Sequence, residues 1–275
     1  MLQKLQPVNY SKITPIFKEL ENQIVIGSVI EGNTRGEIYV NDLETPTFAV
    51  LWDKMDAILI DGILDDNYIE SFAYLVLKQF KPDAISRYLP FFHVYYPNET
   101  WADVVGNKLN SLSPRKVLKF YYEFDKLNKK REIILNNNCI LKRMDEDLLE
   151  KNELVNLNKV IEWINSFWPS IKQFLEKGIG YCVLQNKIIV SWCLSVFVSG
   201  KKVELGLETI ENYRGRGYAK VVSSACIDYC LKHQLKPLWN CNAENMASVH
   251  VAEAVGFKRK KEYFVWHINL LEKEK

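Results

Sequence analysis

Hydrophobic and polar positions follow two distinct periods in the second half of the chain. Three runs rich in β-branched and aromatic residues, 181–185, 187–198 and 201–210, are separated by the turn signals QN and SGK. This pattern predicts an antiparallel meander of three strands. Small or apolar residues then recur every three or four positions across 218–232, which predicts an amphipathic helix packed on that sheet.

The same patterning continues on both sides of the meander. After the helix we expect a strand over 237–241, a second helix from about Met246 to Val255 and a closing strand over 263–270. Before the meander, 160–177 has a helical pattern that Pro169 must break or kink, because proline lacks the backbone N–H. The second half is therefore predicted to be a mixed α/β unit.

A polar stretch over 125–138, basic at its centre and ending in three asparagines, has the composition of a connection. We therefore predict two domains, 1–130 and 131–275. The first half repeats the pattern of the second more weakly: 37–52 and 56–63 resemble the meander, and 67–80 resembles the helix after it. A duplicated fold explains this echo, and so does the general likeness of any two α/β halves.

Composition narrows the class of protein. Of 275 residues, 48% are hydrophobic and 25% charged, which is typical of a globular protein. Thirty-six basic residues against 34 acidic ones give a net charge of +2, so no global field favours nucleic acid. No apolar run is long enough to span a membrane, and no secretion signal is evident. We expect a cytoplasmic protein, whose oligomeric state the sequence leaves open.

Metal chemistry is not expected. The six cysteines match no zinc-binding spacing, and none of the four histidines stands at ligand spacing from another. The cysteines are expected to be reduced and mostly buried; they are Cys139, Cys182, Cys193, Cys226, Cys230 and Cys241.

The chemistry that the sequence does predict centres on Gly215 and Gly217, between a predicted strand and the helix over 218–232. A glycine-rich turn at a helix N-terminus exposes several N–H groups at the positive end of the helix dipole, where a pyrophosphate can approach the backbone closely. Arg214, Arg216 and Lys220 add positive charge around it. A plain glycine turn with solvated arginines is the alternative interpretation.

Several segments together carry a resemblance to a known family. The strand VELGLETI, the loop ENYRGRGYAKVV, the strand PLWNC and the helix NMASVHVAEAVGF look like the two signature motifs of the GNAT superfamily of acetyltransferases. More narrowly, they are similar to the bacterial subgroup that contains the zwittermicin A resistance acetyltransferase. The resemblance covers about 135–270 strongly and the first half only faintly.

The resemblance implies that the second half binds acetyl-coenzyme A as acetyl donor. Arg214, Gly217 and Ala219 match the pyrophosphate motif, and the amides of 215–220 are expected to face the phosphates. Asn245 and Ser248 match polar positions near the pantetheine and the sulfur, although helix capping would explain both equally well. The implied cofactor-binding residues are Leu207, Thr209, Arg214, Gly215, Arg216, Gly217, Tyr218, Ala219, Lys220, Asn245 and Ser248.

Acetyl transfer to an amine requires a base for the incoming ammonium. Glu204 and Glu208 should project to the same face as Gly206, because strand side chains alternate. We favour Glu204 as the catalytic base, since acidic residues near this position serve as base in some family members. A carboxylate that only binds a cationic substrate, or that faces solvent, is the alternative.

The leaving thiolate has no obvious acid. Ala252 occupies the position where the family usually has a tyrosine, four residues before the Gly-Phe pair. Ser248, His250, Cys241 or a water would have to serve, unless coenzyme A thiol is acidic enough to leave unaided. We count Ser248 among the catalytic candidates.

The segment of the first half that corresponds to the phosphate loop, LDDNYIESFA (64–73), has two aspartates, a glutamate and no glycine. We therefore predict an α/β (α+β) protein with two GNAT-like domains, each a mixed, largely antiparallel sheet flanked by helices, of which the first is degenerate. The predicted activity is acetyl transfer to a primary amine of a small molecule. A non-catalytic acyl-coenzyme A binding module, a structural protein and an enzyme acting on a protein amine are the alternatives.

Overall fold

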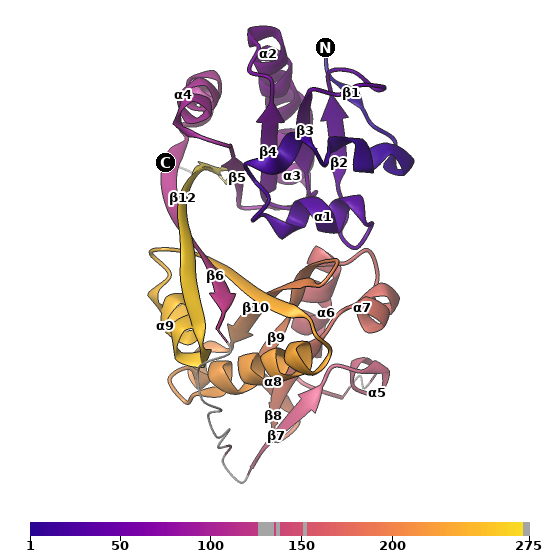
Figure 1. Cartoon of the computed structure of the whole chain (residues 1–275). Helices are drawn as coiled ribbons and strands as arrows, with labels where there is room; N and C mark the ends of the chain where they lie inside the picture. Colours follow the sequence, from indigo (N-terminus) through magenta and orange to yellow (C-terminus); the bar gives the residue numbers. More distant parts are fainter. Residues whose placement is uncertain (126–134, 136–137, 151–152, 272–275) are drawn as a thin grey trace. The chain divides into compact units, whose positions relative to one another are not determined.

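The computed structural model describes residues 1–125, 135, 138–150 and 153–271, which divide into two compact units (Figure 1). Unit 1 is Met1–Lys119 together with the chain from Tyr263 onward, and unit 2 is Phe120–Glu262. The predicted boundary between residues 130 and 131 lies outside the described residues.

Unit 1 is built on a mixed sheet in which the strand order is β1-β2-β3-β4-β5-β12. The pairs β1–β2, β2–β3, β3–β4 and β5–β12 are antiparallel, whereas β4 and β5 are parallel. The strands are β1 (Gln3–Lys4), β2 (Glu37–Val40), β3 (Phe48–Trp52), β4 (Ala57–Gly62), β5 (Phe91–Tyr95) and β12 (Phe257–Asn269), and the first half of β6 (Arg115–Phe124) also belongs to this unit.

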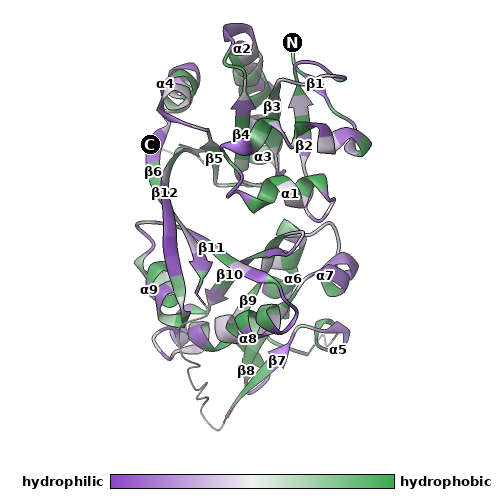
Figure 2. Ribbon diagram, viewed as in Figure 1, coloured by the Kyte–Doolittle hydropathy of each residue, from purple (hydrophilic) through white to green (hydrophobic). Residues whose placement is uncertain are grey.

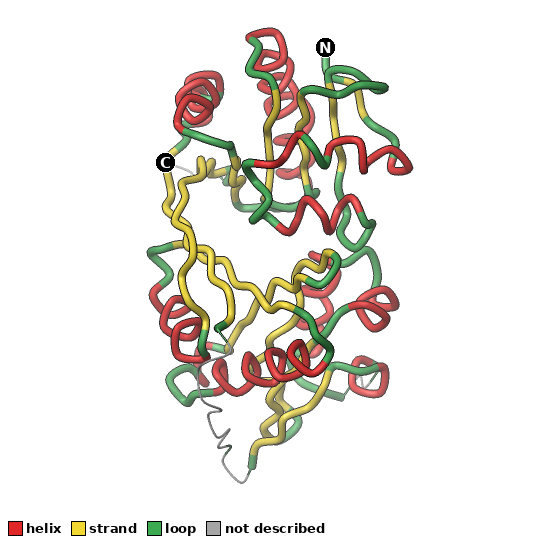
Figure 3. Tube along the Cα trace, viewed as in Figure 1, coloured by secondary structure: helices red, strands yellow, loops and turns green. Residues whose placement is uncertain are grey.

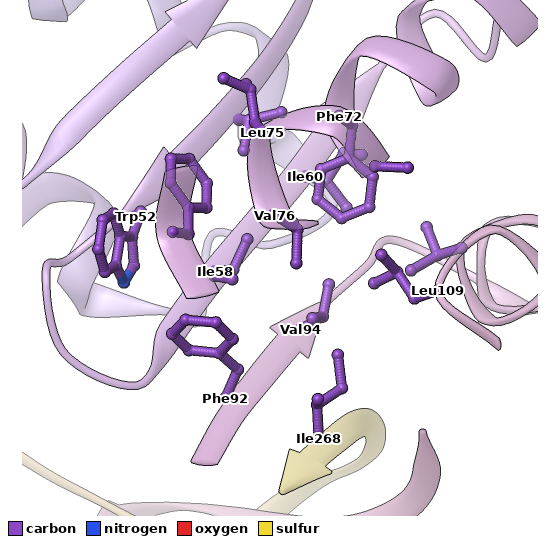
Figure 4. Close-up of a cluster of buried hydrophobic side chains, with 14 of the residues drawn as sticks. Trp52, Ile58, Ile60, Phe72, Leu75, Val76, Phe92, Val94, Leu109 and Ile268 are labelled. Carbon is purple, nitrogen blue, oxygen red and sulfur yellow. The ribbon is translucent and has the colours of Figure 1, made fainter. Parts of the chain in front are cut away.

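One face of this sheet carries the core of unit 1. Phe92, Val94 and Ile268 pack there with Phe72 and Val76 from the helical segment that follows β4 (Figure 4). The helical segments of the unit are η1 (Pro7–Ile13), η2 (Ile16–Lys18), α1 (Ile24–Ile30), α2 (Asp66–Leu75), η3 (Val76–Phe80), α3 (Lys81–Ser86), α4 (Glu99–Lys108) and η4 (Asn110–Leu112).

Unit 2 repeats this construction. Its strands follow the order β12-β6-β11-β10-β9-β8-β7. The meander from β7 to β10 is antiparallel, whereas β10 and β11 are parallel. The strands are β7 (Cys139–Arg143), β8 (Gly180–Gln185), β9 (Ile188–Ser199), β10 (Lys202–Thr209) and β11 (Lys236–Asn242), together with parts of β6 and β12.

Helices cover both faces of the second sheet (Figure 3). Val222 shares a core cluster with Val203 and Leu205 on one face, whereas Trp163 packs with Val196 in a second cluster. The helical segments are α5 (Glu146–Leu149), α6 (Leu157–Phe167), α7 (Ile171–Lys177), η5 (Glu211–Tyr213), α8 (Tyr218–Lys232) and α9 (Met246–Val255).

The predicted fold class is confirmed: both units contain a mixed, largely antiparallel sheet with flanking helices. In each unit three antiparallel strands are followed by a helical segment and then by a strand parallel to the third. The helix expected over 160–177 is interrupted around Pro169, which lies between α6 and α7.

The closing strand differs from the prediction. β12 begins at Phe257, six residues before the expected start at Tyr263. The added segment contains Lys258–Glu262, which is hydrophilic throughout and exposed (Figure 2). Period-two alternation cannot identify such a strand, because both of its faces are charged. Among the described helices, none combines the length and the apolar character that a membrane crossing requires.

Candidate active site

The start of α8 leaves room for an anion. Gly215 and Gly217 both adopt left-handed backbone, with φ of +75° and +83°, and nothing lies within 4 Å of the place where a Cβ would stand on either residue. No side chain caps the helix at Gly217. The first N–H groups of a helix have no partner within the helix, so this turn presents donors and open space together. The residues present therefore fit a pyrophosphate.

The arginines beside this turn donate hydrogen bonds to backbone carbonyls of the segment that leads into it. Arg214 Nε donates to the carbonyl of Thr209 at 3.2 Å, and Arg216 donates to the carbonyl of Asn212 at 3.1 Å. The Arg216 guanidinium also lies 5.1 Å from the centre of the Tyr213 ring. Both arginines are exposed, so they hold the loop in shape while leaving positive charge at its surface.

The three residues after Gly217 have different surroundings. Tyr218 is buried, and its hydroxyl lies 3.2 Å from Cys139 Sγ, so its side chain anchors the helix in the core. The Tyr218 side chain is therefore unavailable to a ligand, which leaves only its backbone N–H. Lys220 is exposed, and its N–H donates to the carbonyl of Gly217 at 3.0 Å. That amide therefore already has an acceptor, while Ala219 is half-buried beside it.

The strands that precede and follow α8 separate. The parallel pairs of β10 and β11 run from Lys202–Lys236 to Glu204–Leu238, although β10 continues to Thr209. A β-bulge accompanies this change: Phe197 pairs with Glu204 and Ser195 with Leu205, so Val196 is an extra residue on β9. Bulges bend a strand and increase its twist, which accounts for the separation.

Leu207 and Thr209 lie beyond the last pair, on the diverging part of β10. The Thr209 hydroxyl is 2.8 Å from Ser191 Oγ, and Ser191 also donates to the carbonyl of Glu208 at 3.1 Å. Side-chain bonds from β9 thus fix the end of β10.

Glu204, Gly206 and Glu208 share one face of β10, as strand alternation requires. This is the face covered by α6: a Cβ on Gly206 would stand 2.6 Å from Val196 and 3.2 Å from the Trp163 ring. Glu204 is 9% exposed, and its Oε2 accepts a hydrogen bond of 3.0 Å from Asn240 on β11. Glu208 is more exposed.

An aromatic chain lies beside these carboxylates. Trp163 makes edge contacts with Trp192 and with Phe167, at ring-centre distances of 6.0 and 5.8 Å, and Phe167 meets Phe197 at 5.7 Å. Phe197 is the cross-strand partner of Glu204, and Trp192 is that of Glu208. The carboxylates therefore stand next to aromatic rings. Sequence reasoning missed this chain, although the aromatic residues within the helical pattern of 160–177 were visible.

Asn245 and Ser248 both have structural partners. Asn245 Oδ1 accepts from the Ser248 N–H at 3.1 Å and so caps α9, and Ser248 Oγ accepts from Trp239 Nε1 at 3.0 Å. The hydroxyl proton of Ser248 is not used by the bond from Trp239, which the oxygen accepts. Asn245 thus acts as the cap that was the alternative interpretation.

Near Ala252 the structure places a tyrosine that sequence reasoning missed. Tyr122, on β6, shares the core cluster of Ala252, and its hydroxyl donates to Glu253 at 3.4 Å. Burial, together with nearby Cys241 and Glu253, raises the pKa of Tyr122 to about 12. The phenol therefore keeps its proton at neutral pH. It precedes the predicted boundary, so no motif of the second half pointed to it.

The remaining candidates are less favourably placed. His250 is exposed on α9 and Cys241 is buried on β11. Among the described residues, no three His, Cys, Asp or Glu side chains gather as a metal-binding group.

The model of the GNAT acetyltransferase family matches residues 14–266. A Bacillus subtilis (strain 168) protein named uncharacterized N-acetyltransferase YdfB is 26% identical over 268 residues, which cover 97% of this chain and 98% of that protein.

Solved structures share the fold. A GCN5-related N-acetyltransferase-like protein from Streptococcus suis 89/1591 superposes with a TM-score of 0.67 at 20% identity, covering 95% of this chain and 99% of that one. A tandem GNAT protein from the clavulanic acid biosynthesis pathway superposes with a TM-score of 0.59 at 9% identity over 100% of both chains. The likeness extends over both units.

Proposed function

The chain belongs to the GNAT acetyltransferase family, and from its geometry we propose that it transfers the acetyl group of acetyl-coenzyme A to a primary amine of a small molecule. The observation that carries the proposal is the open, uncapped glycine turn at Gly215 and Gly217, which follows the end of β10 that continues beyond its last pair with β11. The open glycine turn and the end of the β10–β11 pairing both belong to unit 2, which supports a cofactor site there.

Acetyl-coenzyme A supplies the activated acyl group as a thioester. We assign its pyrophosphate to the amides from Gly215 to Ala219, with Arg214 and Arg216 at the rim. The exposed Lys220 adds charge there. Leu207 and Thr209 offer backbone groups on the diverging part of β10 to the pantetheine and the thioester carbonyl. We assign Asn245 and Ser248, at the start of α9, to the pantetheine and the sulfur, with the Ser248 hydroxyl as a proton donor.

We assign Glu204 as the group that accepts a proton from the incoming ammonium, directly or through a water. Its low exposure and its bond from Asn240 orient the carboxylate, which is how a base is held for proton transfer. Glu208, on the same face and more exposed, would bind the cationic acceptor. A protonated amine needs both: an attractive charge on approach and a base before attack.

For the leaving thiolate we assign Ser248 as the proton donor and Tyr122, whose hydroxyl donates to Glu253, as the second candidate. Ser248 retains its hydroxyl proton, and Tyr122 is a neutral phenol near the position that Ala252 leaves without one. Coenzyme A thiol is itself acidic enough to leave without either.

The acceptor is proposed to be an amino-bearing antibiotic or metabolite, in line with the resemblance to the zwittermicin A resistance subgroup. Carboxylates flanked by Trp163, Trp192 and Phe197 suit an ammonium on a partly apolar body, because aromatic faces attract cations. A protein amine is the second candidate acceptor. The non-catalytic alternative predicts cofactor binding without turnover.

The first half, 1–130, is proposed to have lost cofactor binding, which leaves that role to 131–275. Where α8 starts without a cap, α2 starts with Asp65, whose Oδ1 accepts from the N–H groups of Asn67 and Tyr68 at 2.9 and 3.3 Å. A carboxylate thus already uses the donors that a phosphate would need, and it would repel one.

The test is a thermal-shift measurement with acetyl-coenzyme A, followed by thiol release across a panel of small amines and an amino-terminal peptide. The proposal expects stabilisation by the cofactor and turnover with a small amine. Stabilisation without turnover on any amine would support the non-catalytic alternative. The absence of stabilisation would contradict the assignment of the cofactor site.

A further inference from the structure

Unit 1 has a polar cluster on the sheet face opposite the core of Figure 4. Phe92 and Val94 of β5 point into that core, so Phe91, His93 and Tyr95 point to the other face. His93 is 3% exposed. Buried titratable groups at this density are uncommon in a sheet that serves only as scaffold.

Hydrogen bonds in this cluster fix the tautomers of two histidines. His93 Nδ1 lies 2.9 Å from Asp56 Oδ2, and His93 Nε2 lies 3.3 Å from Nδ1 of its cross-strand partner His267. Burial raises the pKa of Asp56, but the bond from His93 outweighs it, so the pKa is lowered and the carboxylate is ionised. An ionised carboxylate only accepts, so His93 Nδ1 carries the hydrogen.

The tautomer of His93 determines the tautomer of His267. Burial above all lowers the pKa of His93, so the ring is neutral and its Nε2 accepts. His267 must then donate from Nδ1, which leaves a lone pair on His267 Nε2. His267 is only partly buried, so this nitrogen is the end of the chain Asp56–His93–His267 that a ligand can reach.

A buried cation stands in the same cluster. Lys119 of β6 is 9% exposed, and its Nζ contacts the Tyr95 hydroxyl at 3.0 Å. Within the part of the chain that the structure describes, Lys119 forms no ion pair with a carboxylate. Burying an ammonium without an opposite charge is costly. The ionised Asp56 acts on Lys119 only at longer range, so a bound anion in contact with the ammonium would supply the direct partner that Lys119 lacks.

We propose that Lys119, His267 and His93 form a binding site for a small carboxylate on this face of unit 1. The carboxylate pairs with the Lys119 ammonium. His267 Nε2 takes up a proton from solvent, and the resulting imidazolium keeps it and donates an Nε2–H hydrogen bond to the second carboxylate oxygen. Asp56 and His93 hold the ring in the required tautomer. Phe91, whose ring centre is 4.7 Å from that of His93 and 5.0 Å from that of His267, packs against both imidazoles.

The charges that face His267 determine its response. Burial is the largest cause that lowers the pKa of His267, to about 4; His93, Arg115 and Lys119 also disfavour the imidazolium, whereas Asp56 favours it. A carboxylate beside the ring adds a negative charge and reverses part of this. Ligand binding and proton uptake are therefore coupled at one nitrogen.

The test follows the imidazole nitrogens of the full chain by NMR during pH titration, with His267→Gln used to assign the signals. Acetate is the probe, acetamide its neutral isostere, and sodium chloride the control at equal ionic strength. We expect acetate to raise the midpoint of His267 by about one pH unit or more, as an opposite charge at close range does. Acetamide and chloride should leave it unchanged.

Lys119→Met keeps the apolar stem and removes the charge, so the shift caused by acetate should largely disappear. A shift of equal size in Lys119→Met, equal shifts from acetate and acetamide, or no shift from acetate would each overturn the proposal. The comparison of ligands on the unmodified chain needs no variant to fold. Acetyl-coenzyme A plays no part in it, so the result is independent of the proposed function.

Discussion

Substitution of Gly217 should affect both the backbone conformation of the turn and the affinity for the cofactor. Its φ of +83° and the open space around its missing Cβ predict that Gly217→Val loses affinity for acetyl-coenzyme A while the fold survives. The branched side chain would fill the space that the pyrophosphate needs. The left-handed conformation adds a stability cost of about 1–2 kcal/mol. Calorimetric titration of the variant measures the affinity, and its melting curve measures the cost.

Gly200 provides the matched control. It also has positive φ, +52°, and nothing within 4 Å of a Cβ, but it lies in the turn between β9 and β10. Gly200→Val should therefore show a similar strain and unchanged cofactor affinity. If both variants bind acetyl-coenzyme A equally, the loop assignment is wrong.

Glu204 is predicted to determine the pH dependence of turnover. An alkyl ammonium with a pKa of about 10 is mostly protonated at neutral pH, so a positioned base contributes roughly a hundredfold or more. Glu204→Gln preserves size and hydrogen bonding to Asn240 but removes the basicity. Turnover should fall most at neutral pH and recover as pH rises, while cofactor affinity is unchanged.

Glu208→Gln is the matched comparison, since Glu208 lies on the same face of β10. It should raise KM for a cationic amine without that pH signature. Full turnover of Glu204→Gln at pH 7, or recovery at high pH in Glu208→Gln alone, would show that Glu204 is not the base and that another residue of β10 must be assigned.

His267 is predicted to make stability depend on pH below neutrality. Its folded-state pKa of about 4 lies below the ordinary value of 6.5, so the unfolded chain binds the proton first as pH falls. The neutral His267 ring therefore contributes fully to the free energy of unfolding above pH 6.5, and this contribution is lost as the pH falls from 6.5 to 4. Asp61, whose pKa burial raises to about 6, acts in the opposite direction.

Denaturant unfolding of His267→Gln, compared with the unmodified chain, isolates the contribution of the histidine. The variant should lose less stability between pH 6.5 and 4. Parallel curves would exclude its role.

Among the helices and strands, the hydrophobic period predicted those elements that bury one face and expose the other. The amphipathic pattern of 218–232 matches α8 residue for residue, and Pro169 separates α6 from α7 because it cannot continue a helix. The glycine turn and the shared face of Glu204 and Glu208 follow from local rules in the same way. The early start of β12 does not, because Lys258–Glu262 is charged on both faces.

Pairing between distant strands is what local rules could not supply. Asn240 reaches Glu204 only because β11 pairs with β10, and Tyr122 reaches unit 2 only because β6 lies beside β11. The contact of His93 with His267 likewise depends on the pairing of β5 with β12. None of these long-range contacts leaves a signal in a single sequence.

Strand exchange between the halves leads to a prediction for β6 and β12. Tyr122 of the first half is fully buried in unit 2, and Ile268 of the second half is fully buried in the core of unit 1. The segments 1–130 and 131–275 should therefore each fail to fold when expressed alone and recover when co-expressed. Circular dichroism and thermal unfolding test this; a cooperative transition in 131–275 alone would contradict it.

For the whole molecule, the central claim is that one of the two similar units binds the acetyl donor. The uncapped glycine turn of α8 offers donors and space, whereas Asp65 already occupies the donors of α2. Both units share a topology, so local chemistry at the helix start decides the difference.

Calorimetric titration of the intact chain with acetyl-coenzyme A tests this claim most directly, because it reports affinity and stoichiometry together. We predict one site per chain, lost in Gly217→Val and retained in Gly200→Val. Two equivalent sites per chain, or a single site that survives Gly217→Val, would contradict it.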